Sequence, residues 1–297
     1  MSGLPLGVAA ITLDFGNTLV RVDRAGLRAV VEDTADSLGL RGVVTDRAAF
    51  LTAWAEERER QFREEVPAFH EVDITQRAVR VLARLRGLTP PPREERWDDL
   101  VAATRVEPEE IDVVVDAYSG AFIDRMTPVA DARATLERLS GRGFALAILS
   151  NWPLAATIDR FAESNGWLPY LKAIVVSQRV GTIKPHPAIF RATEEAIGLV
   201  LEPGDERAIL HVGDDWAADV VGANRAGWRT AYLRGRQDDT PLPTSEPGDG
   251  VGDGPPVAAD LEIDELSDLD AQVELAPPGS SGTPPGREAA SATVTTT

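Results

Sequence analysis

The chain has 297 residues, of which 43% are hydrophobic, so it can bury one large core or two modest ones. Its formal net charge of −18 repels polyanions and disfavours non-specific nucleic-acid binding, which needs clustered lysine and arginine. Because cysteine is absent, the chain has no disulfide, zinc–thiolate site or thiol nucleophile, which fits a reducing compartment.

The N-terminal residues show no basic stretch followed by a cleavable apolar run. No segment has the roughly 20 consecutive apolar residues that a membrane-spanning helix needs. We therefore expect a soluble, cytoplasmic protein that binds neither membranes nor nucleic acids. The sequence leaves its oligomeric state open between a monomer and a homodimer.

The first predicted element is the short apolar run Val8 to Leu13, which suits a strand buried on both faces of a parallel sheet. From about Val22 to Met126 apolar residues recur at helical spacing, which is typical of amphipathic helices. A turn at Pro90 to Pro92 divides this region, and Pro108 with two following glutamates begins its last helix. We expect a helical insert of four or five helices.

After the helical region, predicted strands alternate with predicted helices. The strands are Phe144 to Leu149, Ala173 to Val176 and Ala208 to Val212, and the helices are Leu154 to Asn165 and Pro187 to Ile197. This alternation predicts a doubly wound, Rossmann-like α/β fold with a parallel sheet. Because ligands bind beyond the carboxyl ends of such strands, the polar residues that follow them should meet at one edge of the sheet.

The C-terminal part is polar and rich in turn formers. Residues 237–256 predict a flexible acidic loop, and Leu261 and Ile263 predict an edge strand before a short helix through Leu275. Residues 276–297 have no apolar pattern and are predicted to be disordered. The predicted organisation is an α/β core of residues 1–20 and 127–275, an all-helical insert of residues 21–126 and a tail of residues 276–297.

Acidic residues gather after two of the predicted strands. Asp14 follows the first strand directly, and Gly16 lets the backbone turn closely around a ligand. Asp214 and Asp215 follow the strand that ends at Val212, with Asp219 one turn further on. Carboxylates about 4 Å apart repel by a few kcal/mol, so this cluster indicates a bound cation, and hard oxygen ligands favour magnesium.

Two further motifs are ambiguous when each is considered alone. Ser150 and Asn151 end the second long strand, where both residue types also favour helix capping. Lys184 precedes Pro185 and Pro187, whose fixed φ angles would hold its ammonium group in place, although an isolated lysine is usually solvated.

Together, four motifs in this order resemble the haloacid dehalogenase superfamily of hydrolases. They are Asp14-Phe15-Gly16-Asn17-Thr18-Leu19, Ser150-Asn151, Lys184-Pro185-x-Pro187 and Gly213-Asp214-Asp215-x-x-x-Asp219. The motifs and their strands account for about Val8 to Val20 and Thr127 to Leu233, and the helical insert stands where the family has its cap domain.

The resemblance implies a Mg²⁺-dependent hydrolase, foremost a phosphatase of a small phosphorylated metabolite. Asp14 would form an aspartyl-phosphate, and an ordinary pKa of about 3.9 would keep it ionised. Lys184 would neutralise charge on Asp14 and the phosphoryl group. The implied substrate-binding residues are Asn17, Thr18, Ser150, Asn151 and Lys184. The implied magnesium ligands are Asp14, the Gly16 carbonyl and Asp214, with Asp215 or Asp219 as a further ligand or as an acceptor that fixes the geometry.

Gly16 departs from the family's usual phosphatase motif, which has an aspartate there as general acid and base. Loss of that catalysis is worth about 10²–10⁴ in rate. Candidate substitutes are Asp215, Asp219, His70 or a substrate with a good leaving group. Two alternatives therefore stay open: a 2-haloacid dehalogenase-type hydrolase, and a catalytically impaired binding protein with this fold.

The cap would select the substrate. The aromatic and charged side chains that could line its cavity are Trp54, Phe62, Phe69, His70, Tyr118 and Arg125. The highly charged stretch 56–65 is interpreted as a solvated, ion-paired helix face.

Overall fold

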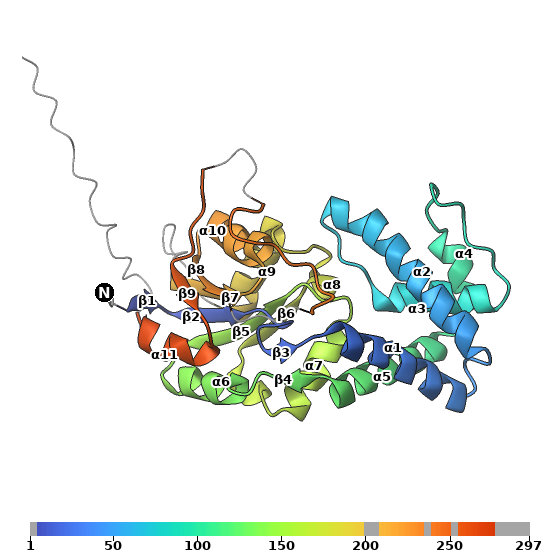
Figure 1. The fold of residues 1–297 in the computed structure, drawn as a ribbon, viewed down its shortest axis with the longest axis horizontal. Helices are drawn as coiled ribbons and strands as arrows, with labels where there is room; N and C mark the ends of the chain where they lie inside the picture. The colour runs from blue at the N-terminus through green and yellow to red at the C-terminus, as the bar shows by residue number, and fades with distance from the viewer. Residues whose placement is uncertain (1–4, 199–207, 235–238, 251–254, 277–297) are drawn as a thin grey trace, which may run out of the picture.

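The computed structural model describes residues 5–198, 208–234, 239–250 and 255–276. Its centre is a six-stranded, all-parallel sheet with the strand order β6-β5-β2-β7-β8-β9. A group of helices extends from one end of this core (Figure 1). The strands are β2 (Ala10–Leu13), β5 (Ala145–Ser150), β6 (Ala173–Val176), β7 (Ile209–Gly213), β8 (Arg229–Leu233) and β9 (Leu261–Ile263).

The apolar runs predicted as strands form the middle of the sheet. Every residue of β2 and β7 is buried, and β2 pairs with β5 on one side and β7 on the other. Each fully buried leucine or isoleucine there contributes about 1.5–3 kcal/mol relative to exposure. The first predicted strand is divided in two, since β1 (Leu6–Val8) leaves the sheet and pairs with β10 (Val273–Leu275).

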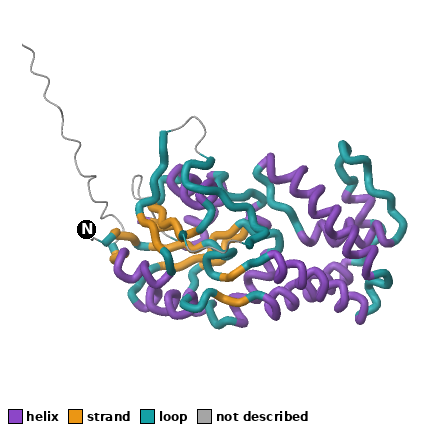
Figure 2. The backbone as a smooth tube through the Cα atoms, viewed as in Figure 1, coloured by secondary structure: helices purple, strands orange, loops and turns teal. Residues whose placement is uncertain are grey.

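Helices cover both faces of the sheet, which confirms the predicted doubly wound arrangement (Figures 1 and 2). One apolar cluster contains Phe161 and Leu136, and a second contains Phe190 and Trp228. On the first side lie α6 (Ala132–Gly141), α7 (Ala155–Ser164) and α11 (Leu269–Gln272), and on the second α9 (Pro187–Ile197) and α10 (Gly222–Arg225). Shorter turns are η2 (Leu168–Tyr170), α8 (Ser177–Val180), the π-helical turn η4 (Trp216–Val221) and η5 (Leu266–Asp268).

The region between the first and second long strands is helical, as predicted. Its elements are α1 (Arg24–Leu40), α2 (Arg47–Glu65), η1 (Val66–Ala68), α3 (Ile74–Leu85), α4 (Asp99–Ala103) and α5 (Pro108–Arg125). Pro108 begins α5 behind a capping box formed by Glu107 and Glu110. The two ends of this helical insert meet in the antiparallel pair β3 (Val20–Arg21) and β4 (Thr127–Pro128), close to the predicted boundary.

The insert is packed tightly onto the core through α5 and α7. The hydroxyl groups of Ser119 and Thr157 are 3.1 Å apart and buried. The rings of Phe122 and Phe161 lie 5.8 Å apart, edge to face, within an apolar cluster that includes side chains of the insert and of the core. Insert and core therefore share one hydrophobic interior.

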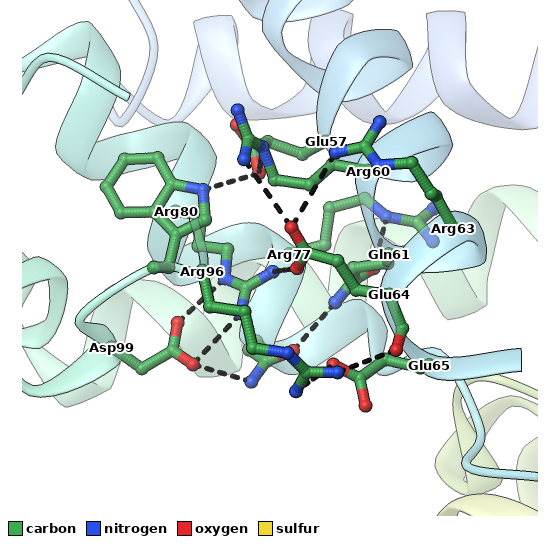
Figure 3. Close-up of polar contacts among 12 residues, drawn as sticks. Glu57, Arg60, Gln61, Arg63, Glu64, Glu65, Arg77, Arg80, Arg96 and Asp99 are labelled. Carbon is green, nitrogen blue, oxygen red and sulfur yellow. Dashed lines mark hydrogen bonds and ion pairs between the residues drawn. The ribbon is translucent and has the colours of Figure 1, made fainter. Parts of the chain in front are cut away.

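A buried polar network ties α2, α3 and α4 together (Figure 3). The Glu57 carboxylate accepts hydrogen bonds of 2.8 Å from Arg84 and from the Trp97 indole. Asp99 accepts two from Arg80, at 2.7 and 2.9 Å. Glu57 is only 1% exposed, so the prediction of a solvated face is wrong for this residue. Because a buried carboxylate is costly unless paired, this network fixes how the three helices pack.

The C-terminal part corrects one predicted element. Leu261 and Ile263 lie in the edge strand β9, as predicted. The helix that was expected to reach Leu275 ends at Gln272, and Val273–Leu275 forms β10, since apolar residues flank Glu274 with strand periodicity. Residues 277–297 of the predicted disordered tail lie outside the described residues. Within the described ranges, no helix is long and apolar enough to cross a membrane.

Candidate active site

Three of the predicted site residues lie at the carboxyl ends of neighbouring strands. Asp14 directly follows β2, Ser150 is the last residue of β5, and Asp214 directly follows β7. Since β2 runs parallel to both neighbours, the three residues share one edge of the sheet. The strand order therefore brings Asp14, Ser150 and Asp214 to a single edge of the sheet, as predicted.

Lys184 reaches the same edge from the loop before α9 and is 3% exposed. Its ammonium group donates to Asp14 Oδ1 at 2.8 Å, to Asp219 Oδ1 at 2.6 Å and to the Leu149 carbonyl at 3.0 Å. The Asn151 side chain holds the backbone of Lys184, accepting from its N–H at 2.7 Å and donating to its carbonyl at 3.0 Å. The position of the ammonium group is therefore fixed from both ends.

Asp219 is held on both carboxylate oxygens. Oδ1 faces Lys184 and the Nε2 atom of His211, 3.0 Å away, and Oδ2 accepts from the Asp215 N–H at 2.9 Å. A Cβ atom on Gly213 would come closer than 3.0 Å to this carboxylate, so only glycine fits there. Two further residues of this network, His211 and Thr12, were not among the predicted site residues, and the Thr12 hydroxyl is 2.8 Å from His211 Nδ1. The signal that could have identified both is a single polar residue within an otherwise apolar, buried strand.

The loop that follows Asp14 holds Asp214. Asn17 donates to Asp214 at 3.3 Å, and the Thr18 hydroxyl lies 3.5 Å from the other carboxylate oxygen. Asn17 adopts a left-handed φ of 59°, which asparagine tolerates better than most residues. The side chains of Asn17 and Thr18 thus orient Asp214, and their predicted role in substrate binding stays a prediction.

Burial and pairing shift the pKa values of the central ion pairs. Burial raises the pKa of Asp14, although Lys184 opposes the shift, so the expected ordinary value is wrong. For Lys184, burial lowers the pKa, but Asp14 and Asp219 outweigh it and raise the value above the ordinary one. The pKa of Asp219 lies well below its usual range despite burial, because Lys184 and His211 stabilise its charge. The ammonium group therefore stays charged at neutral pH.

Burial and mutual repulsion also act on the remaining acids. Burial, and then repulsion from Asp14, raises the pKa of Asp214 well above its ordinary value. Burial, and then Asp219, raises the pKa of Asp215. Buried carboxylates that repel one another are the kind of donor set that a hard divalent cation neutralises.

Only some of the predicted metal ligands are compatible with a metal site in this structure. Among the described residues, no three acidic or histidine side chains are arranged to hold a metal ion. A set of Asp14, Asp214 and the Gly16 carbonyl needs only two side chains, so it remains compatible with the donors present. Asp219, with both oxygens bonded within the protein, stands behind this set as an acceptor that positions Lys184.

An unpartnered hydroxyl and a cavity lie beside these charges. The Ser150 hydroxyl is buried, with no hydrogen-bond partner among the described residues. A cavity of about 320 Å³ lies between the insert and the core, with Lys184, Asn151 and Asp215 on its wall. A buried unpaired hydroxyl costs about 1–3 kcal/mol, which an oxygen-rich ligand would relieve.

Two of the predicted insert residues, Phe62 and Tyr118, line this cavity. The other four do not line it. Trp54 is buried and Phe69 is exposed, Arg125 pairs with Asp33 at the surface, and the His70 ring faces Glu65 at 3.3 Å. Sequence reasoning missed a different part of the wall, the segment Pro241–Ser245, which belongs to the predicted acidic loop.

A family model of haloacid dehalogenase-like hydrolases matches residues 8–227, most of the chain. The chain belongs to the haloacid dehalogenase-like hydrolases. The resemblance carried by the four motifs is thereby confirmed. The matched range includes the helical insert as well as the edge of the sheet that carries Asp14, Lys184 and Asp219.

Known members of the family include phosphatases and dehalogenases. The chain is 33% identical to ribulose-1,5-bisphosphate 5-phosphatase of Halopiger xanaduensis over 40% of this chain and 47% of that protein. It is 28% identical to phosphoserine phosphatase of Thermus thermophilus over 82% of this chain and 95% of that protein. The first four curated relatives are matched over only 47% to 61% of their own length.

A solved structure shares the fold. The 2-haloacid dehalogenase of Pseudomonas syringae pv. Tomato DC3000 superposes with a TM-score of 0.56 at 20% identity, over 89% of this chain and 96% of that chain. At this identity the likeness shows that the two haloacid dehalogenase-like proteins have the same architecture.

Proposed function

We propose that the chain is a Mg²⁺-dependent phosphatase of a small phosphorylated metabolite, with Asp14 as the nucleophile. The observation that carries this proposal is the buried ammonium group of Lys184, held between Asp14 and Asp219 and adjacent in the fold to the unpartnered hydroxyl of Ser150. Phosphatases among the curated relatives, at 28% to 33% identity, support the same reaction class.

The carboxylate of Asp14 performs the bond changes in this proposal. Lys184 binds Oδ1, which leaves Oδ2 to attack phosphorus. As the new oxygen–phosphorus bond forms, the bond from phosphorus to the leaving oxygen breaks, and that oxygen keeps the electron pair. Water then attacks phosphorus, the bond to Asp14 breaks, and the carboxylate is restored with release of phosphate.

Positive charge and hydrogen-bond donors stabilise the negative charge of the phosphoryl group. Lys184 balances the charge of Asp14 before the reaction and that of the phosphoryl oxygens during it, and the Ser150 hydroxyl and the Asn151 backbone donate to those oxygens. Asp14, Asp214 and the Gly16 carbonyl would hold Mg²⁺, with Asp215 as an added acceptor. When bound, the ion supplies charge that lets a carboxylate approach an anionic phosphate. The helical insert of residues 21–126 is the cap in this proposal.

The test is hydrolysis of 4-nitrophenyl phosphate with Mg²⁺ and with excess chelator. We expect turnover only with Mg²⁺, and loss of turnover in Asp14→Asn, whose amide cannot attack phosphorus. The matched control is Asp36→Asn, at a half-exposed position on α1, which should keep its activity. Turnover that survives in Asp14→Asn contradicts the mechanism, and halide release from chloroacetate in chelator favours dehalogenase chemistry instead.

A further inference from the structure

A segment between β8 and β9 lies over the nucleophile loop. We call residues 239–250 the strap, because hydrogen bonds fix it to the active-site loops. The Thr240 hydroxyl accepts from Asn17 at 3.0 Å, and the Ser245 hydroxyl accepts from the Ala217 N–H at 2.6 Å and donates to Asp215. In Figure 1 the strap runs from the edge of the sheet toward the helical insert.

Leu242 of the strap occupies the space above Gly16. A Cβ atom built on Gly16 would approach the Cδ1 atom of Leu242 to less than 3.0 Å and would lie 3.4 Å from Trp152. No larger side chain fits at position 16 while Leu242 stays where it is. Position 16 is where the family's usual phosphatase motif has its acidic residue. Leu242 therefore occupies the space that the missing acid would need.

Two of the candidate substitutes for that acid are engaged elsewhere, and the third, Asp215, lies on the cavity wall with one carboxylate oxygen held by hydrogen bonds. Asp219 uses both oxygens, to bind Lys184, His211 and the Asp215 N–H. The Oδ1 atom of Asp215 accepts from the Ala218 N–H at 3.1 Å and from the Ser245 hydroxyl. The remaining candidate, His70, pairs with Glu65 and lines a different cavity, one that Lys184 does not touch.

The cavity beside Lys184 fits an apolar leaving group that departs as an anion. Its wall includes Leu242, Trp152, Phe62, Tyr118 and Ile183, so the body of a bound ester would lie among apolar side chains. Its charged lining consists of Lys184, Arg58 and Arg77 with Glu71 and Asp215. Because Lys184 is already paired with Asp14 and Asp219, the two arginines are the further cations of this wall.

Arg77, one of the cations of this lining, is held in place. Arg77 is 4% exposed and donates to Gln61 at 3.0 Å, a contact within the network of Figure 3. Its guanidinium also lies over the Trp54 ring, 5.4 Å from the centroid. Fixed cations in an apolar cavity stabilise negative charge on a departing oxygen without giving it a proton.

We propose that Gly16, with Leu242 filling the space that an acid at position 16 would need, makes this chain selective for phosphate esters whose leaving oxygen is weakly basic and is attached to an apolar body, as in aryl esters. The inference rests on the proposed phosphatase function. In the step concerned, the phosphorus–oxygen bond breaks as Asp14 attacks, and the leaving oxygen keeps the electron pair and departs as an oxyanion. The leaving oxygen of an alkyl ester of the same size is strongly basic and would need a proton, which Gly16 cannot supply.

The experiment compares phenyl phosphate with cyclohexyl phosphate, which are similar in size but have a weakly and a strongly basic leaving oxygen, respectively. For the natural sequence we expect kcat/KM to be higher for phenyl phosphate by at least about 100-fold, the value of a missing general acid. The double variant Gly16→Asp with Leu242→Ala should raise kcat/KM for cyclohexyl phosphate by about 10-fold or more. The gain should be smaller for 4-nitrophenyl phosphate, whose leaving group needs no proton, so the ratio of kcat/KM for cyclohexyl phosphate to kcat/KM for 4-nitrophenyl phosphate should rise.

Two single variants are matched controls. Leu242→Ala opens the space without adding an acid, so the preference for phenyl phosphate should persist. Gly16→Asp alone should lower turnover of both esters, since Leu242 fills the space. Equal kcat/KM for the two esters in the natural sequence would overturn the inference while leaving the phosphatase proposal intact. If Asp215→Asn then loses cyclohexyl phosphate selectively, Asp215 is the donor. Hydrolysis of neither ester, nor of 4-nitrophenyl phosphate, would remove both proposals.

Discussion

Replacement of Lys184 by methionine should destabilise the protein strongly and in a pH-dependent way. Lys184 is the cation that faces both Asp14 and Asp219, at 2.8 and 2.6 Å, with all three side chains largely buried. Methionine has nearly the same length but no charge. In the Lys184→Met variant two neighbouring carboxylates therefore stay buried without their cation.

The magnitude follows from the cost of an unpaired buried charge. Removal of one partner of a buried ion pair costs about 3–5 kcal/mol, and here two acids lose the same partner. Their pKa values must then rise, so the folded variant holds protons that its unfolded chain releases. Stability of the variant should therefore fall as pH rises from about 5 to about 8, and the deficit against the natural sequence should be smallest at the acidic end.

Urea unfolding of both proteins in chelator, at several pH values in this range, measures the deficit. The m-value should be unchanged if both unfold in one step. The matched control is Lys172→Met, which removes the only other lysine of the sequence from an exposed position and should change stability by less than about 0.5 kcal/mol. A Lys184→Met deficit below about 1 kcal/mol, or one that does not vary with pH, refutes the reasoning.

Three further variants test other parts of the structure. Burial raises the pKa of Glu71 to about 7. The protonated carboxyl therefore contributes to the free energy of unfolding fully below about pH 4.5, and this contribution is lost as pH rises through 7. Glu71→Gln should remove this slope, worth up to about 3 kcal/mol, when melting is followed from pH 5 to 8. Trp97→Phe deletes the indole donor to buried Glu57 and should cost about 1.5–3 kcal/mol in urea unfolding, whereas a neutral result would mean that water replaces the donor. Leu269→Ala should cost about 2–5 kcal/mol, since Leu269 is fully buried, and a loss under 1 kcal/mol would show that α11 packs weakly.

The edge of the sheet could be predicted because its signals are local. Short apolar runs that end in an acid or a serine mark buried strands, and parallel pairing alone then brings Asp14, Ser150 and Asp214 to one side. The helical insert was predictable for the same reason, because helical spacing is visible within about 15 residues. The family resemblance added roles that spacing alone does not give.

Most of the contacts that were missed are long-range in sequence. Nothing near Glu57 indicates that Trp97, forty residues away, will bury it. His211 acquires its place from Thr12 and Asp219, on either side of it in the fold. Leu242 lies in an acidic, turn-rich stretch whose composition indicates only a loop, and its approach to Gly16 joins two segments that are over 200 residues apart.

The shared interior of insert and core limits how the substrate can enter. Because Phe122 and Ser119 of α5 are seated against α7, swinging the insert away as a rigid body would tear open a continuous apolar interior. Access is cheaper through small displacements of insert side chains on the cavity wall, such as Phe62. Exchanging this insert for that of a relative would likewise require an α7 whose side chains pack against the new insert. A change of substrate selectivity through the insert is therefore coupled to changes in the core.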